Sequence, residues 1–129
     1  MTSKYQLAMT IGAAAALFVV GAPAGQAQTG PGPAYLVVEL NVKNQQAFME
    51  YAEKATRTVS QYGGSFVVLA REAKAIEGTE PDGVVTIIRF DSIGDAQAWL
   101  DSAEYSQVKG IRHASADTRQ YLVEGVPDR

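Results

Sequence analysis

The sequence has no cysteine and only one histidine among its 129 residues. Without cysteine, the chain can form no disulfide framework, no thiolate nucleophile and no metal site with cysteine ligands. A single histidine also excludes any site that one chain builds from two or three histidines. Positive charge is scarce as well, because 11 lysines and arginines face 14 acidic residues, for a net charge of −3. This balance argues against a dedicated nucleic-acid-binding protein, which needs a basic surface.

Several catalytic and ligand-binding motifs are also missing. No Gly-x-Ser-x-Gly segment provides the sharp turn that exposes a nucleophilic serine. The carboxylates lack the spacing of a calcium-binding loop. Gly-Pro-Gly-Pro at 30–33 precedes a predicted strand rather than a helix, so it is not a phosphate-binding loop. We therefore predict neither a metal nor a cofactor.

Residues 1–27 are typical of a cleavable secretory signal peptide. Lys4 supplies a positive charge, and a short apolar core follows at 11–20. Gly25 and Ala27 place small side chains at the positions that signal peptidase requires, which predicts cleavage after Ala27. The alternative, a permanent membrane helix, needs about 20 apolar residues, roughly twice this run. We therefore expect a periplasmic or secreted protein with no membrane association after cleavage.

The rest of the chain has the size of one domain. A second possible cleavage site follows Ala24, but either cut leaves a Gly- and Pro-rich segment at 28–33, which we interpret as a flexible lead-in. The patterned part covers 34–126, and 127–129 form a short tail. About 100 residues suffice for one hydrophobic core.

Strand and helix patterns alternate after the lead-in. Period-2 alternation and short apolar runs predict strands over 34–42, 65–76, 84–90 and 118–126. Apolar residues at three- and four-residue spacing predict one helix over 44–62 and another over 92–112, interrupted near Ser102. Asn44 and Ser92 are the expected N-caps of these two helices.

This order predicts a ferredoxin-like α+β fold. A β-α-β-β-α-β chain with right-handed crossovers and a central hairpin favours a four-stranded antiparallel sheet in the order 4-1-3-2. Both helices then cover the same face of the sheet. The other face carries many apolar side chains, whose exposure to water is unfavourable. We expect it to bear Tyr35, Val37, Val67, Leu69, Val85 and Ile87.

Segments distributed along the whole patterned region resemble one bacterial family. They are Ala34-Tyr35-Leu36-Val37, Tyr62-Gly63-Gly64, Phe90-Asp91-Ser92, Ala98-Trp99-Leu100-Asp101-Ser102 and Leu122-Val123-Glu124-Gly125-Val126. The chain is similar to the family called domain of unknown function 1330, within the dimeric α+β barrel superfamily. This resemblance implies a homodimer in which two sheets face each other and cover their apolar surfaces. It also implies kinship with cofactor-free monooxygenases and small-molecule-binding barrels.

Charged side chains on the uncovered face are candidates for ligand binding. Glu39 and Arg89 lie on strands expected to be antiparallel neighbours, so they are predicted to form a pair that lines a cavity between two subunits. The alternative is an ion pair at the rim, worth about 0–1 kcal/mol. Arg71 and Tyr35 are further candidates on that face, although Tyr35 is also explained by packing.

Arg112 and His113 are the candidate catalytic residues. A histidine near Asp117 can act as a general base, and an arginine can bind a carboxylate or an enolate. The alternatives are that His113 is an exposed or capping side chain at a helix end, and that Arg112 is structural and pairs with Asp117 or with a carboxylate across the cavity.

These observations leave three functional hypotheses. The first is an exported dimeric barrel that binds a small organic molecule in an apolar cavity at the sheet face. The second is a cofactor-independent monooxygenase or isomerase that acts on an enolisable or aromatic substrate. The third is a haem-binding barrel with His113 as axial ligand. The sequence does not identify the ligand or substrate.

Overall fold

The computed structural model describes residues 30–129. Its elements are β1 (Ala34–Val42), α2 (Gln45–Gln61), β2 (Ser65–Glu72), β3 (Val84–Phe90), α3 (Ile93–Leu100), α4 (Ala103–Ser115) and β4 (Ala116–Glu124). The predicted signal peptide and its cleavage site lie outside the described residues. Within the described part, no helix has the length and apolar character needed to cross a bilayer.

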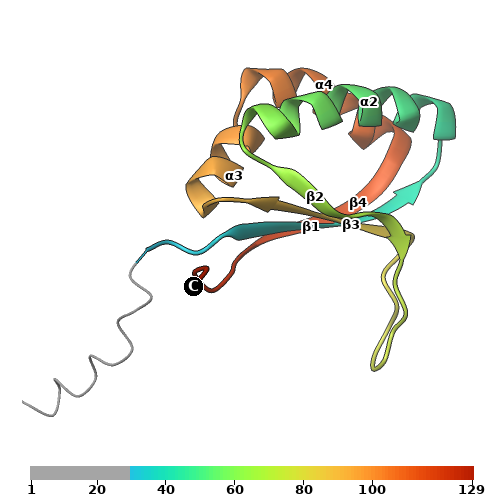
Figure 1. Cartoon of the computed structure of the whole chain (residues 1–129). Helices are drawn as coiled ribbons and strands as arrows, with labels where there is room; N and C mark the ends of the chain where they lie inside the picture. The colour runs from blue at the N-terminus through green and yellow to red at the C-terminus, as the bar shows by residue number, and fades with distance from the viewer. Residues whose placement is uncertain (1–29) are drawn as a thin grey trace, which may run out of the picture. The chain divides into compact units, whose positions relative to one another are not determined.

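The four strands form one antiparallel sheet in the order β2-β3-β1-β4. Read from the other edge, this is the predicted order 4-1-3-2, so the ferredoxin-like topology is confirmed. The three helices all lie on one face of this sheet (Figure 1). Strand β3, which carries apolar residues on both of its faces, lies inside the sheet between β2 and β1.

Short polar side chains begin each helix. Asn44 accepts a hydrogen bond from the backbone N–H of Ala47, and Ser92 accepts one from Asp95. Ser102 does the same for α4, which confirms the predicted interruption between two helices. Each cap satisfies a backbone donor that the first helical turn leaves free.

Trp99 lies at the centre of the core, between α3 and the other two helices. Its ring centre is 4.1 Å from that of Tyr105 and 5.8 Å from that of Phe90, so α3 packs against both α4 and β3. Its indole N–H donates a buried 2.8 Å hydrogen bond to Thr58 Oγ1 on α2. A buried indole needs such a partner, and here the partner fixes α3 against α2.

Strand β2 differs from its predicted alternation. Phe66 lies opposite Ile88 and Val68 opposite Ile87, so Val67 is an extra residue without a partner. A second irregularity follows before Arg71, where Ala70 has a φ of +48°. One inserted residue moves every following side chain to the other face. Leu69 therefore points to the helix side, and its predicted place on the outer face is wrong.

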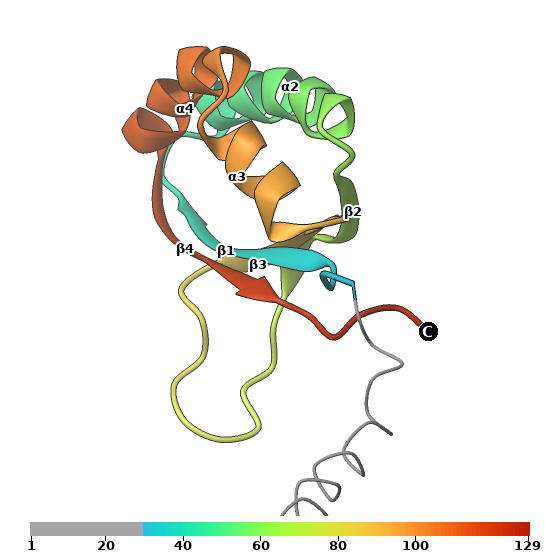
Figure 2. The ribbon, with the colours of Figure 1, turned by 90° about the vertical axis from the view of Figure 1, so that its left-hand side faces the viewer.

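The face opposite the helices, the outer face below, carries no helix of the described chain (Figure 1). Its apolar side chains come from all four strands and are Tyr35, Val37, Val68, Val85, Ile87, Tyr121 and Val123. Tyr121 and Val123 remain 44% and 48% exposed. The segment 73–83 between β2 and β3 projects beyond the sheet on this same side (Figures 1 and 2).

Candidate functional site

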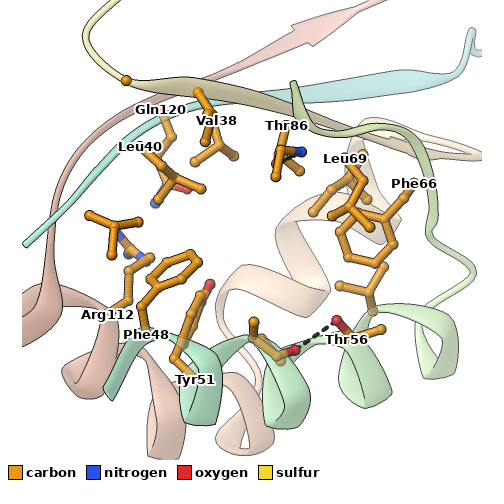
Figure 3. Close-up of a pocket in the computed structure, with 18 of the residues that line it drawn as sticks. Val38, Leu40, Phe48, Tyr51, Thr56, Phe66, Leu69, Thr86, Arg112 and Gln120 are labelled. Carbon is orange, nitrogen blue, oxygen red and sulfur yellow. Dashed lines mark hydrogen bonds between the residues drawn. The ribbon is translucent and has the colours of Figure 1, made fainter. Parts of the chain in front are cut away.

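A pocket of about 460 Å³ lies between α2 and the helix-covered face of the sheet (Figure 3). Most of its lining is apolar and comes from every layer around it: Val38 and Leu40, Phe48 and Val59, Phe66 and Leu69, Ile88 and Trp99. Its volume is within the range of small-molecule sites. The sequence led us to expect a cavity at the sheet face shared with a second copy, whereas this pocket is within one chain.

Small side chains on α2 keep this space open. Ala52, Ala55 and Thr56 line the pocket from the helix, and Ala70 and Thr86 line it from the sheet. Protein interiors are otherwise filled to crystal-like density, so small residues on facing surfaces leave real volume between them. The irregularity in β2 shapes the pocket in another way, because it places Leu69 in the lining.

The two ends of the pocket differ in polarity. Arg112 and Gln120 lie at one end, and Phe66 and Leu69 lie at the other (Figure 3). The ring of Tyr51 stands near the polar end. A ligand in this pocket would therefore meet the charged side chain of the lining, Arg112, at one end.

Arg112 is the most unusual side chain of the site. It is 4% exposed, and none of the salt bridges formed within residues 30–129 includes it. Its Nη2 donates to Tyr105 Oη at 3.2 Å, and its Nε is buried with no hydrogen-bond partner. Buried arginine is normally paired with a carboxylate, because an isolated buried charge is strongly unfavourable.

Tyr51 adds a neutral phenol beside the guanidinium. Its ring centre is 6.0 Å from the guanidinium carbon of Arg112. Burial, together with the neighbouring Tyr105, raises the pKa of Tyr51 well above its ordinary value, and Arg112 only partly opposes this. The phenol is therefore protonated at neutral pH, so it can donate a hydrogen bond but cannot serve as a base.

A smaller polar recess adjoins the same arginine. It is lined by Arg112, His113, Ala116, Asp117, Thr118 and Gln120. Thr118 Oγ1, on β4, is a second buried polar atom without a partner in the described part of the chain. Arg112 and Gln120 line both spaces, so the apolar pocket and the polar recess meet at these two side chains.

The predicted Glu39–Arg89 pair is wrong. Glu39 lies opposite Arg119 of β4 and Val85 of β3, and it accepts a 2.9 Å hydrogen bond from Arg119 Nε. Arg89 lies opposite Tyr35, which precedes Glu39 by four residues in β1, and donates hydrogen bonds to Asp91 and Asp128. The register therefore pairs Glu39 with β4 and not with β3.

The four predicted ligand-contacting residues lie outside the pocket. Tyr35, Glu39, Arg71 and Arg89 all occupy outer-face positions of the sheet. They do not meet the pocket lining described above. Their role in a cavity between two subunits stays a prediction, since only a second copy could enclose them.

The structure brings the two predicted catalytic residues together. His113 Nε2 lies 3.2 Å from Arg112 Nη2, and because a guanidinium only donates, this ring nitrogen must accept. The alternative pairing of Arg112 with Asp117 is absent, since Asp117 pairs with Lys43 at 3.5 Å. His113 lines the recess and not the apolar pocket, which gives no support to haem ligation. Within residues 30–129, no group of three metal-ligating side chains occurs.

Sequence reasoning missed Tyr51, Thr118 and Gln120. Two signals could have found the polar end of the site. Arg112 belongs to the buried stripe of α4, a position at which an apolar residue is normal. The other buried residues of this helix are Tyr105, Val108 and Ser115. Thr118 and Gln120 alternate with the outer-face residues of β4, which places polar groups on the side where the core lies.

Solved structures of similar fold come from several bacteria. A protein of unknown function from Rhodopseudomonas palustris has a TM-score of 0.62 at 15% identity, and the match covers 80% of this chain and 89% of that one. A dimeric ferredoxin-like protein of unknown function from Jannaschia has a TM-score of 0.58 at 14% identity, covering 73% and 100%. SnoaB, a cofactor-independent oxygenase from Streptomyces nogalater, has a TM-score of 0.55 at 13% identity, covering 75% and 96%.

Such low identities establish a shared fold and no shared chemistry. No curated protein matches the sequence. The model of one family, described as domain of unknown function DUF1330, matches residues 33–126, which is nearly all of the region that forms the sheet and helices. The chain therefore belongs to the DUF1330 family.

Proposed function

We propose that this protein is an exported, dimeric binding protein that takes up a small, largely apolar molecule in the pocket between α2 and the sheet. One observation supports this most strongly: a space of about 460 Å³ in a small domain, kept open by small residues on two facing elements and lined mainly by apolar side chains. Filling such a space with ligand removes apolar surface from water, which supplies the binding free energy.

A neutral fluorescent dye tests the pocket directly. N-phenyl-1-naphthylamine becomes strongly fluorescent in apolar surroundings and carries no charge, so it reports the apolar end alone. We expect saturable binding to the protein. In Ala52→Phe, the added ring occupies the pocket from α2, and dye affinity should fall at least tenfold.

The matched control is Ala98→Phe, an exposed position on α3 that lines none of the described spaces. It should bind the dye as the wild type does. If Ala52→Phe binds the dye unchanged, the dye occupies another surface, such as the bare outer face. That result would remove the pocket from the proposal.

The dimer part of the proposal is supported by the bare outer face. Several apolar side chains from all four strands lie there with no helix of the described chain over them, and two of them are nearly half exposed. A second copy stacked on this face would bury them, and the 73–83 segment would then flank that copy. The similar structure from Jannaschia is described as dimeric. Sedimentation velocity should give the mass of two chains.

Export is supported by the apolar run at 11–20 and the small residues before position 28. Expression of the full chain in a Gram-negative host, followed by fractionation, tests it. We expect a periplasmic protein whose N-terminal peptide begins at Gln28. Recovery of intact chains from the membrane fraction would instead indicate a retained anchor.

A second candidate function is cofactor-independent oxygenation or isomerisation. The observation in its favour is that SnoaB, a cofactor-independent oxygenase, has a similar fold. Such chemistry needs a base at the pocket, but Tyr51 is held protonated and His113 lies outside the apolar lining. Turnover of a discovered substrate that survives His113→Gln but not Arg112→Met would assign substrate binding, and not proton abstraction, to this end of the site.

A further inference from the structure

We infer that the ligand of this pocket is a monocarboxylate, an acid with one negative charge and an apolar body, whose carboxylate binds Arg112. This inference rests on the proposed function, because it concerns the same pocket. It goes further by assigning the chemical class of the ligand and the residue that selects it.

The positive charge of Arg112 is not balanced within the described chain. Arg112 is 4% exposed and has no carboxylate partner among residues 30–129. Its other contacts, Tyr105 Oη and a ring nitrogen of His113, are not carboxylates. A buried cation without a carboxylate partner is unfavourable until an anion arrives, so this arrangement favours an anionic ligand.

Two buried polar atoms near this charge lack a hydrogen-bond partner among the described residues. Arg112 Nε and Thr118 Oγ1 are the buried side-chain atoms of the described chain that have no hydrogen-bond partner. They come from α4 and β4, yet both side chains line the same recess. Unsatisfied buried groups are rare in folded proteins, and these two side chains, which border the same recess, can both donate to an acceptor bound there.

The charged residues around the pocket and the recess indicate how many negative charges the ligand carries. Arg112 is the only arginine or lysine among the residues that line the pocket and the recess. The recess also contains the carboxylate of Asp117, which Lys43 pairs with from outside the recess. One guanidinium beside an existing carboxylate suits a single negative charge and disfavours a phosphate dianion.

The charged side chain of the pocket and its large apolar side chains lie at opposite ends. Arg112 and Gln120 lie at one end, while Phe66 and Leu69 lie at the other (Figure 3). A molecule with an acid at one end and hydrocarbon at the other matches this gradient. A polar ligand with charges at both ends would leave its second charge among apolar side chains.

Octanoate and octan-1-ol test the inference as a matched pair. They share the alkyl chain and differ in the charged head. Trp99 is the single tryptophan of the chain and lines the pocket, so its fluorescence reports binding of either molecule. At pH 7 we expect the wild type to bind octanoate at least tenfold more tightly than octan-1-ol.

Arg112→Met should abolish that preference. Octanoate affinity should fall at least tenfold, while octan-1-ol affinity stays within threefold of the wild type, because the apolar end is untouched. Arg112→Lys keeps the charge but not the planar fork, and should recover part of the octanoate affinity. Arg57→Met, which removes a surface arginine paired with Glu53, is the matched charge control and should bind both molecules normally.

A second readout separates recognition of the head group from folding. In carbon-13 NMR of octanoate labelled at its carboxyl carbon, the bound acid should have a lower pKa in the wild type than in Arg112→Met, since a nearby guanidinium favours the ionised form. Retained octan-1-ol binding by each variant shows that its pocket is intact.

The possible failures are distinguishable. Equal binding of octanoate and octan-1-ol to the wild type would overturn the carboxylate inference and leave the apolar pocket standing. Binding of neither molecule, together with no dye binding, would overturn the proposed function itself. An octanoate preference that persists in Arg112→Met would place the acid elsewhere and overturn the role of Arg112.

Discussion

The two faces of the sheet each bury one charged side chain, and the chain treats the two charges differently. On the outer face, Glu39 is 7% exposed and is bonded by Arg119 from the neighbouring strand. On the helix side, Arg112 is equally buried but has no carboxylate within the described residues. The chain itself balances the first charge, whereas the second is left unbalanced, which supports the proposal that an anionic ligand binds there.

The surroundings of the two charges sharpen this contrast. Glu39 interrupts an apolar surface that is open to a second copy, and its partner Arg119 is itself mostly exposed. Arg112 interrupts the buried stripe of a helix and lines a pocket that is already formed in one chain. The outer face is thus suited to another protein, and the pocket is suited to a small molecule.

The largest expected effect comes from placing a charge in the middle of the outer face. Ile87 lies opposite Val37 on one side and Val68 on the other. In Ile87→Glu, a dimer formed through this face would have to bury an unpaired carboxylate, which costs several kcal/mol. We expect the dissociation constant to rise about a thousandfold, or about 4 kcal/mol, measured by sedimentation velocity over a concentration series.

Its control places the same charge on the helix layer. Gln107→Glu changes an exposed position of α4 and should leave the dimer unchanged. Dissociation of both variants would indicate a general effect of charge. A full dimer in both would show that the outer face is not the interface.

The next effect concerns the balanced charge. Arg119→Met removes the partner of Glu39 and leaves its buried carboxylate with fewer donors. We expect the free energy of unfolding in urea at pH 7 to fall measurably. In the double variant with Glu39→Gln the loss should be smaller than the sum of the two single losses, since the two side chains act as a pair. Strict additivity would contradict the pairing.

The unbalanced charge should respond in the opposite way. Arg112→Met replaces a buried cation with an apolar side chain of similar length, so the ligand-free protein should unfold at unchanged stability or up to about 2 kcal/mol higher. The measurement is the same urea titration, which makes the two arginines directly comparable. A loss as large as that of Arg119→Met would mean that Arg112 is structural and would weaken the contrast between the faces.

Much of the fold was predictable because it depends on local patterns. Alternation in the strands, the three- and four-residue spacing in the helices and the caps at Asn44, Ser92 and Ser102 are properties of neighbouring residues. Together with the rules for connecting strands, they were sufficient for the sheet order. The start of β4 was placed two residues late, because Ala116 pairs across the sheet with Val42 and gives no local strand signal.

The site was less predictable because it depends on distances between elements. No residue pattern predicts that Val67 is an extra residue or that Ala70 adopts a positive φ. These features nevertheless place the side chain of Leu69 on the pocket side of the sheet. The space under α2 depends on how closely the helix approaches the sheet, which apolar periodicity does not specify. Arg112 was chosen from its chemistry, but its missing partner became visible only when the neighbours of its guanidinium were known.

The smallest expected effect tests whether the helix that bears Arg112 can be strengthened without disturbing the pocket. Gly110 lies inside α4, and a methyl group added there would meet no atom within 4 Å. Gly110→Ala should raise the free energy of unfolding by about 0.4–1 kcal/mol, because alanine loses less backbone freedom on folding. Octanoate affinity should be unchanged, since Gly110 lines neither the apolar pocket nor the polar recess. Gly64→Ala is the contrasting variant: its methyl group would lie 2.6 Å from Val59 Cγ1, so the same change should destabilise the protein there. A gain in stability at Gly110 accompanied by weaker octanoate binding would mean that α4 must flex for Arg112 to reach its ligand, and the pocket could then no longer be regarded as preformed.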